Sequence, residues 1–526
     1  MGIEPAELAR RIWAKDPAVW IKDEIRLEGS ATHKEIVDRL GWLRVASAMQ
    51  ARSADLASFA REVKSAGFNR VVLLGMGGSS LAPLVFRRIC GSSSGLELEV
   101  ADTTDPAAIS SIEKGGDIAR TLFIVSSKSG GTIEVDSLYR YFYGATGGNG
   151  AQFIAITDPG TKLEKMAREN SFRRTFINPP DIGGRFSALS LFGLVPAALI
   201  GIDVTALLER AVRMMRDCDL SAPGRNPGLQ LGLAMARAWE EGRDKLTLVA
   251  DDQLEPLGLW VEQLVAESTG KNGRGIVPVA LEPVGDPASY SPDRLFVSVA
   301  MKDDATMEAK LSALEGAGHP VVRLRLNDAL DLGAEFFRWE FATAVAGAVM
   351  EINPFDQPNV QEAKIKTQEA LAELASSGKL PDPPSGDSAV AVREALATLA
   401  PGKDYISLLA FLPYDAGIEK ALGGLQASLR DRFRVPVTRG FGPRYLHSTG
   451  QLHKGGANNG VFFLMACGQA KDLDIPGVPF SFAQLERAQA LGDRASLEGK
   501  GRRVVWIGLP DSSPASVAQA CALFKP

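Results

Sequence analysis

Short apolar runs, each followed by a segment with helical periodicity, recur along most of this sequence. Between residues 70 and 179 the runs are RVVLLGM, LELEVADT, TLFIVSS, AQFIAITD and RRTFINP. A second group follows from 245 (KLTLVA, IVPVALEP, RLFVSVAM, VVRLRLN) and a third from 404 (YISLLAFL, VPVTRG, VFFLMA, RRVVWIGL). Strands that alternate with helices form parallel sheets covered by helices on both faces. The sequence therefore predicts an α/β protein built from doubly wound parallel sheets.

The grouping of these runs predicts the domain organisation. Residues 1–65 carry apolar side chains every three or four positions, which predicts a helical N-terminal cap. We expect a first lobe at 66–204, a helical connection at 205–244 and a second lobe at 245–378. The stretch SSGKLPDPPSGDSAVA is rich in Pro, Gly and Ser and is the best linker candidate. An additional C-terminal α/β region is expected at 390–526.

Length, charge and cysteine spacing exclude several classes of protein. A chain of 526 residues accommodates about three domains of ordinary size. A net charge of −5 gives no reason to expect nucleic acid as a partner. The four cysteines lie far apart without a C-x-x-C motif, which favours reduced thiols, and the charged N-terminus is unlike a signal peptide. The longest apolar stretch, SALSLFGLVPAALIGI, is too short for a membrane span. We therefore expect a cytoplasmic protein with no membrane or nucleic-acid partner.

The run TLFIVS ends abruptly in a polar loop that contains Ser127, Lys128, Ser129 and Thr132. A helical pattern begins directly after this loop. A strand, a Ser/Gly loop and a helix in that order bring together backbone N–H groups, hydroxyls and the positive end of a helix dipole. The pattern is typical of a phosphate site, although an ordinary capped turn would have the same sequence.

A second glycine-rich loop, GMGGSSLAP, follows the first strand and contains Gly78 and Ser79. It partly matches the dinucleotide-binding fingerprint, and Asp102 lies at the end of the next strand. The third glycine of the fingerprint is replaced by Ser80, so the match is incomplete. A loop that lets a small ligand approach the backbone is the preferred interpretation. A nucleotide-dependent dehydrogenase is the weaker alternative.

Two charged residues stand in surroundings that suit catalysis. Arg185 follows Gly-Gly in DIGGRFSAL, where its guanidinium could approach a ligand closely. Glu267 lies on the same helix face as Trp260 and Leu264, near the helix end in LWVEQLVAESTGK. A carboxylate on an apolar face is a candidate general base, and a structural glutamate is the alternative.

The segment INPFDQPNVQEAK contributes two further candidates. Gln357 and Lys364 are seven residues apart, so on a helix they would share one face about 10.5 Å apart. An amide and an ammonium so placed could bind hydroxyl groups.

The motifs GMGGSSLAP, SSKSGGT, DIGGRFS, AESTGK and INPFDQPNVQEAK, in this order, resemble the phosphoglucose isomerase family over residues 70–375. The stretches RYLHSTGQLHKGG and PFSFAQLERAQALGD resemble the variant isomerase half that some bacteria fuse to transaldolase. The resemblance implies two flavodoxin-like sugar-isomerase lobes with the active site between them. It also implies a homodimer without metal or organic cofactor, working alongside a transaldolase.

The same resemblance implies roles for the candidate residues. The reaction would interconvert glucose 6-phosphate and fructose 6-phosphate through a cis-enediol. Glu267 would move a proton between C2 and C1, Arg185 would stabilise the enediolate, and Lys364 would assist ring opening. The implied phosphate seat is Ser127, Lys128, Ser129 and Thr132, and the implied sugar contacts are Gly78, Ser79 and Gln357. A non-catalytic sugar-phosphate-binding regulator is the alternative, but it would need neither base nor arginine.

The sequence departs from the family in one respect. Ordinary family members carry a ring-opening histidine between the base and the INPFDQ segment, and this chain has none in GIVPVALEPVGDPASYSPDRLFVSVAM. His447 and His453 lie in a Gly-, Ser- and Thr-rich stretch of the C-terminal region, which is typical of a site-forming loop. Our hypothesis is that this region folds back so that one of them, with Lys364, opens the sugar ring. A histidine bonded only to backbone is the alternative for each.

Overall fold

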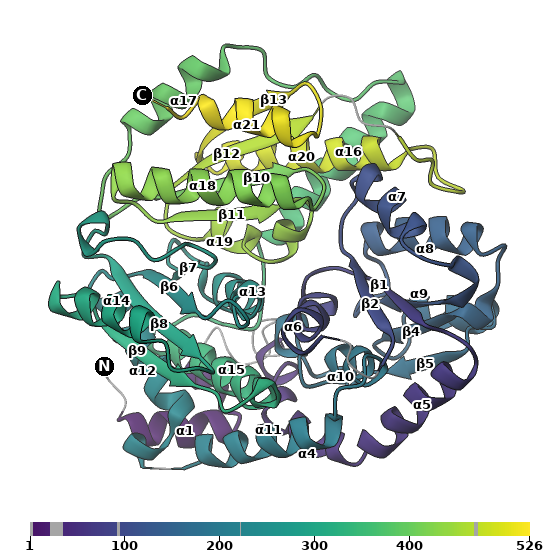
Figure 1. Cartoon of the computed structure of the whole chain (residues 1–526), viewed down its shortest axis with the longest axis horizontal. Coiled ribbons are helices and arrows are strands. Elements are labelled where there is room, and N and C mark those ends of the chain that lie inside the picture. The colour runs from purple at the N-terminus through teal and green to yellow at the C-terminus, as the bar shows by residue number, and fades with distance from the viewer. Residues whose placement is uncertain (1–3, 22–34, 92–94, 221, 468–471, 526) are drawn as a thin grey trace.

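Three separate parallel sheets organise the chain in the computed structural model (Figure 1), which describes residues 4–21, 35–91, 95–220, 222–467 and 472–525. Their strand orders are β2-β1-β3-β4-β5, β7-β6-β8-β9 and β11-β10-β12-β13. In each sheet the first strand has the second on one side and the third on the other, which is the flavodoxin-like doubly wound order. The predicted fold class is confirmed, and every strand in the described part of the chain overlaps a predicted apolar run.

The bounds of the strands are as follows. They are β1 (Arg70–Gly75), β2 (Glu97–Ala101), β3 (Thr121–Ser126), β4 (Phe153–Thr157), β5 (Arg174–Ile177), β6 (Lys245–Ala250), β7 (Val277–Val279), β8 (Arg294–Ala300), β9 (Val321–Arg325), β10 (Tyr405–Phe411), β11 (Val437–Phe441), β12 (Gly460–Cys467) and β13 (Arg503–Leu509).

Helices connect and cover these strands. They are α1 (Pro5–Trp13), α4 (Trp42–Gln50), α5 (Ser53–Ser65), α6 (Leu81–Cys90), α7 (Pro106–Lys114), α8 (Ile133–Ala145), α9 (Lys162–Glu169), α10 (Leu191–Leu199), α11 (Val204–Cys218), α12 (Pro227–Glu240), α13 (Leu257–Thr269), α14 (Ala305–Gly316), α15 (Leu332–Val349), α16 (Val360–Ser377), α17 (Ser388–Ala397), α18 (Ala416–Phe433), α19 (Gly450–Gly455), α20 (Phe482–Gly499) and α21 (Pro514–Ala522).

Both faces of the first sheet are buried at its central strands. Along β1, Val71 and Leu73 belong to the large core shared with the second lobe, whereas Val72 and Leu74 belong to a separate cluster on the opposite face. Alternate residues of a strand point to opposite faces, so a strand covered on both sides has no polar position. This is why the strands appear in the sequence as continuous apolar runs.

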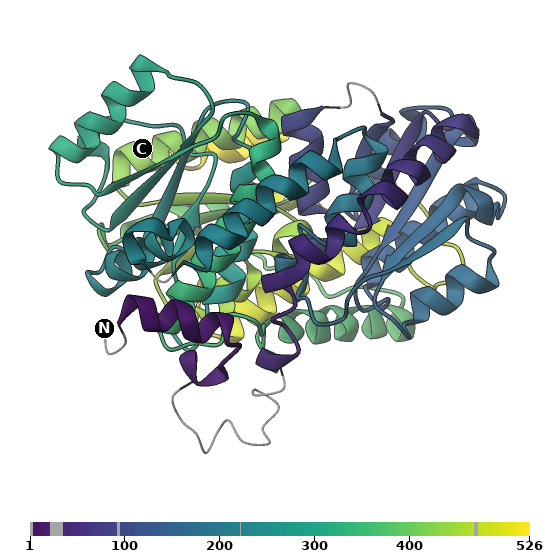
Figure 2. The same ribbon diagram turned by 90° about the horizontal axis from the view of Figure 1, so that it is seen from below.

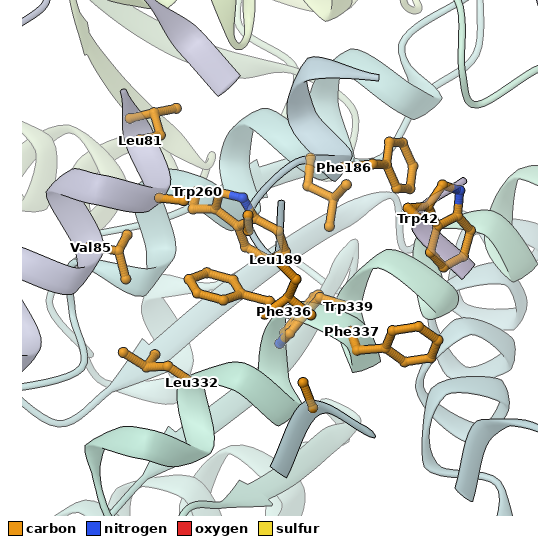
Figure 3. Packing of buried hydrophobic residues seen from close by; sticks show 14 of the residues in the cluster. Trp42, Leu81, Val85, Phe186, Leu189, Trp260, Leu332, Phe336, Phe337 and Trp339 are labelled. Atoms are coloured by element: carbon orange, nitrogen blue, oxygen red, sulfur yellow. The ribbon is translucent and has the colours of Figure 1, made fainter. Parts of the chain in front are cut away.

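The two lobes share one hydrophobic core, shown in Figure 3. Leu81 and Val85 of α6 in the first lobe face Trp260 of α13 and Phe336 of α15 in the second. The rings of Trp260 and Phe336 pack edge to face with centroids 4.7 Å apart. Each buried side chain of this size contributes about 1.5–3 kcal/mol, so the lobes are joined firmly.

The described N-terminal residues are helical, as predicted; residues 1–3 and 22–34 of the predicted 1–65 cap lie outside the described residues. Seen from below, these helices lie across both lobes (Figure 2). Helix α1 packs on α15, α4 on α11 and α5 on α10. The Trp20 indole N–H donates to the carbonyl of Ala344 over 2.8 Å.

The third sheet and its helices pack against both lobes. Helix α19 contacts α13, and β11 lies beside β7. Helix α16, which we assigned to the second lobe, packs along α20 of this third region (Figure 1). None of the helices within the described ranges has the length and apolar character needed to cross a membrane.

Candidate active site

A cavity of about 810 Å³ lies where the two lobes and the third region meet. The predicted site residues that line it are Gly78, Ser79, Lys128, Ser129, Thr132, Arg185, Glu267, Gln357, Lys364 and His447. Two predicted residues, Ser127 and His453, are not among the lining residues. The structure thus brings together residues that are separated by up to several hundred positions in the sequence.

The Ser/Gly loop forms one wall of the cavity, between the carboxyl end of β3 and the first turn of α8. Ser127 is buried behind the loop, with its hydroxyl 3.2 Å from that of Thr132. Its Oγ also accepts a hydrogen bond from the N–H of Gly130 over 3.1 Å. Ser127 therefore shapes the loop, whereas Ser129 and Thr132 line the cavity.

Lys128 is held at the edge of this loop by protein groups. Its ammonium forms an ion pair with Asp158 and donates to the carbonyl of Pro180 over 3.0 Å. Burial lowers the pKa of Lys128, an effect that Asp158 opposes, and burial raises the pKa of Asp158. Asp158, which the sequence did not suggest, is the counter-ion of this lysine.

The glycines of GMGGSS make room for protein segments as well as for a ligand. A Cβ on Gly77 would lie 2.6 Å from the carbonyl oxygen of His447, and one on Gly78 would lie 2.1 Å from that of Gly184. Gly77 also has a φ of +54°, which favours glycine. These close approaches bring the His447 turn and the Gly-Gly-Arg turn to the cavity.

The dinucleotide interpretation does not fit the structure. Asp102, the residue that would bind a ribose, is fully buried. Its two carboxylate oxygens accept hydrogen bonds from Nε and Nη2 of Arg444 over 2.6 and 2.8 Å. Asp102 therefore anchors the third region to the first lobe and is not available to a cofactor.

Arg185 is buried, and all three nitrogen atoms of its guanidinium donate hydrogen bonds to protein groups. Its Nε donates to Oγ of Ser268 over 2.7 Å, and its Nη1 donates to Oε1 of Gln357 over 3.0 Å. Nη2 donates to the carbonyl oxygens of Pro354 and Asp356 over 2.7 and 2.9 Å. A guanidinium held by this many acceptors is a fixed positive charge, which is what stabilisation of a developing oxyanion requires.

Glu267 stands next to this arginine in the last turn of α13. Its Oε1 lies 3.4 Å from Nη1 of Arg185, and its Oε2 accepts from Nε2 of Gln263 over 3.1 Å. The residue is only 8% exposed, yet its side chain lines the cavity. A carboxylate beside a fixed cation can take up a proton from a bound molecule while the cation stabilises the negative charge that results.

Gln357 and Lys364 both line the cavity, but they do not share a helix as predicted. Helix α16 begins only at Val360, and Gln357 lies in the preceding turn. The reason is Pro358, because a proline disfavours the helical conformation of the residue before it. Lys364 stands one turn into α16, where its side chain is exposed to the cavity.

His447 is the contribution of the third region to the cavity. It ends a short 3₁₀ turn (Arg444–His447), and its Nε2 lies 2.8 Å from Oε1 of Glu134. The same Glu134 oxygen accepts a hydrogen bond from Nε2 of Gln489 over 2.7 Å. Burial raises the pKa of Glu134, but the His447 imidazole, a backbone hydrogen bond and Lys364 together more than offset this, so the pKa lies below its usual value.

His453 lies outside the cavity. It is 2% exposed, and its ring packs against those of Phe462 and Tyr445 with centroids 5.0 and 6.0 Å away. Burial lowers the pKa of His453 well below its ordinary value, with the nearby Lys454 adding to the effect. His453 is thus a neutral residue of the core, and of the two candidate histidines only His447 reaches the cavity.

No group of three His, Cys, Asp or Glu side chains in the described parts of the chain could hold a metal ion. The residues that line the cavity are instead suited to an anion, to hydroxyl groups and to proton transfer.

Comparison with known proteins identifies the family. The sequence model for phosphoglucose isomerase matches residues 43–276. The glucose-6-phosphate isomerase of Rubrobacter xylanophilus is 30% identical over 382 residues, which cover 62% of this chain and 88% of that protein. The chain belongs to the phosphoglucose isomerase family. The glucose-6-phosphate isomerase of Prochlorococcus marinus is 28% identical, over 65% of this chain and 76% of that protein.

Solved structures agree with this assignment at the level of the fold. A hypothetical protein from Thermus thermophilus superposes with a TM-score of 0.58 and 23% identity, over 69% of this chain and 96% of that one. A glucose-6-phosphate isomerase from Chlamydia trachomatis gives a TM-score of 0.56 and 19% identity, over 70% of this chain and 84% of that one. The segment matched by the phosphoglucose isomerase model ends before the third region, from which His447 comes.

Sequence reasoning missed several polar residues around the phosphoglucose isomerase motifs. Glu134, Gln263, Gln489 and Asp158 were not among the candidate residues. Glu134 and Gln489 are 355 positions apart, and no periodicity in either helix indicates that they meet. Of these, Asp158 had a signal that could have been used: it ends the predicted run AQFIAITD, and polar residues at the carboxyl ends of parallel strands gather at one edge.

Proposed function

We propose that the protein interconverts D-glucose 6-phosphate and D-fructose 6-phosphate through a cis-enediol(ate) intermediate. Membership of the phosphoglucose isomerase family supports this, as do the names of its relatives. The single observation that carries the proposal is the pairing of Glu267 with Arg185, 3.4 Å apart in a cavity that the Ser/Gly loop also lines.

The chemistry of the step fits these two groups. The Glu267 carboxylate removes the proton from C2 of the open-chain aldose, and negative charge develops on the former carbonyl oxygen at C1. The Arg185 guanidinium stabilises that charge. Return of the proton from Glu267 to C1, together with transfer of the O2 proton to O1, leaves the carbonyl at C2. The electrons stay within the sugar, so the step requires no redox partner.

The remaining cavity residues bind and open the sugar. We assign the phosphate to the loop of Ser129 and Thr132, where hydroxyls and the start of α8 favour an anion. Binding energy gained at a phosphate remote from C1 and C2 positions the reacting carbons. Gly78, Ser79 and Gln357 are assigned to sugar hydroxyls.

Ring opening is assigned to His447 together with Lys364. Opening a pyranose moves a proton from the C1 hydroxyl to the ring oxygen, and imidazole is suited to such transfers near neutral pH. The contact with Glu134 fixes the orientation of the His447 ring at the cavity wall. Both residues line the same cavity as the proposed base.

We also propose that the protein acts in the cytoplasm as a homodimer and works alongside a transaldolase. The homodimer and the transaldolase rest on the family resemblance of the sequence, and the cytoplasm rests on its widely spaced cysteines and charged N-terminus. Sedimentation of the purified protein measures its oligomeric state.

The activity is tested by supplying fructose 6-phosphate and coupling the formation of glucose 6-phosphate to an NADP-dependent dehydrogenase. We expect turnover without added metal and no turnover of unphosphorylated fructose at the same concentration. A purified, folded protein that converts no sugar phosphate would overturn the proposal.

A further inference from the structure

We infer that Lys271 is a positioning residue for the isomerisation: it holds the 353–357 turn, and through that turn it fixes Arg185 and Gln357. The inference rests on the proposed function, since it assigns Lys271 a part in the same reaction. Lys271 itself is not among the residues that line the cavity.

Lys271 is buried just beyond the end of the helix that carries Glu267. It is 2% exposed, and its backbone pairs with Arg274 in a tight turn, with N–O distances of 2.9 and 3.0 Å. The turn aims the side chain inward, away from solvent. A buried ammonium is costly unless it is paired, so its partners indicate why it is there.

Both partners of the ammonium belong to one turn. Nζ of Lys271 lies 2.7 Å from Oδ1 of Asp356, and it also donates to the carbonyl of Asn353. The amide oxygen of Asn353 in turn accepts from the N–H of Phe355 over 2.9 Å. Lys271 thus fixes the turn at its first residue and near its end.

Arg185 binds the same turn. Three of its hydrogen bonds end on this turn: Pro354 lies between the two residues held by Lys271, Asp356 is one of those two, and Gln357 follows directly. The carbonyl of Asp356 accepts from Arg185, while its carboxylate faces Lys271. If the turn moves, the guanidinium and the Gln357 amide move with it.

The charges around Lys271 give the arrangement a pH dependence. Burial lowers the pKa of Lys271 to about 8, and the charged groups that act on it are Asp356, Arg185 and Glu267. Below that pH the ammonium is charged and pairs with Asp356. As the pH rises through about 8 the charge is lost, and Asp356 loses its counter-ion.

The test compares Lys271→Met with the parent and with Lys302→Met, a control at an exposed lysine of the second lobe. We expect kcat to fall about 10- to 100-fold in Lys271→Met, because small displacements of catalytic groups cost this much. KM should rise by only about threefold, because the phosphate loop is untouched and, of the proposed sugar contacts, only that of Gln357 is disturbed. The basic limb of the kcat–pH profile near pH 8 should disappear in the variant. Lys302→Met should match the parent.

A second variant keeps the inference testable if Lys271→Met does not fold. Asp356→Asn leaves Lys271 in place but weakens its ion pair, and Asp356 is partly exposed, with 21% of its side chain accessible. We expect Asp356→Asn to lower kcat in the same way, and Lys271→Met to have little additional effect in that background. A parent-like kcat in either single variant would overturn the inference. An inactive parent would overturn the proposed function, and this inference with it.

Discussion

The first and second lobes share one topology but differ at the carboxyl ends of their strands. In the first lobe, β1 and β3 are followed by GMGGSS and SKSGGT, loops of glycine and hydroxyl residues that line the cavity. In the second lobe, β6 and β8 are followed by Asp251 and Met301. The Asp251 carboxylate accepts hydrogen bonds from the N–H groups of Leu254 and Met301 over 3.1 and 2.8 Å. A protein carboxylate thus fills the place that an external anion would take.

The second lobe contributes its opposite edge to the active site. Glu267 lies in the last turn of α13, the helix that leads from β6 back to the start of β7, so it is toward the amino edge of its sheet. The carboxyl ends of β6 and β8 line other cavities, of about 230 and 460 Å³, which share no residue with the active-site cavity. In both lobes the topology places loops at the carboxyl edge of the sheet, where an anion can bind. The residues of those loops determine whether that edge lines the active-site cavity. One lobe supplies the proposed phosphate seat and the other the proposed base.

The largest effect on substrate binding is expected when a carboxylate is introduced into the proposed phosphate seat of the first lobe. The variant Ser129→Asp does this, and it makes the loop resemble the second lobe, where Asp251 follows the strand. Two like charges about 4 Å apart near a protein surface repel by ~4 kcal/mol, so KM for fructose 6-phosphate should rise about 100-fold or more. Steady-state kinetics measure this, and Ser129→Asn is the neutral control of similar size. An unchanged KM in Ser129→Asp would show that the loop is only a turn.

A comparable effect, confined to one form of the substrate, is expected for His447→Ala. Removal of a general acid–base should slow conversion of fructose 6-phosphate by about 100-fold. 5-Deoxyfructose 6-phosphate lacks the hydroxyl that closes the furanose ring and stays open, so the variant should convert it at the parent rate. Proton NMR follows both reactions.

His453→Gln serves as the control for this comparison. His453 lies in the core, so its replacement should lower thermal stability without changing the ratio of the two rates. Equal losses on the cyclic and open-chain substrates in His447→Ala would contradict the ring-opening role.

The sequence predicted the strands well because a strand that is buried on both faces appears as a continuous run of apolar residues, as in TLFIVS and VFFLMA. It also indicated the residues whose motifs are local, such as Ser129 and Arg185. It could not indicate that Lys128 pairs with Asp158 or that His447 meets Glu134, because these contacts depend on how distant segments pack. The choice between His447 and His453 was open for the same reason, since they are six residues apart in one polar stretch. Burial decides it.

The smallest effect on activity is expected at the edge of the second lobe that the active site does not use. Asp251→Ala removes two hydrogen bonds to backbone N–H groups, which should cost about 1–2 kcal/mol of stability. The thermal midpoint should fall by a few degrees, while KM and kcat for fructose 6-phosphate stay as in the parent. A large change in KM would mean that this edge also binds substrate, and the contrast between the lobes would fail.

We propose that the first lobe binds the phosphate and that the second supplies the base. The most direct test is to measure deuterium uptake by sugar phosphate in D₂O, for the parent and for Glu267→Gln. The parent should exchange the migrating proton and turn over, whereas Glu267→Gln should do both about 10³-fold more slowly because the amide is not a base. Calorimetry should show that the variant still binds fructose 6-phosphate with a Kd close to that of the parent, since the seat in the first lobe is intact. Glu255→Gln, at an exposed glutamate just before the same helix, is the control and should exchange normally. Deuterium uptake at the parent rate in Glu267→Gln would contradict the account.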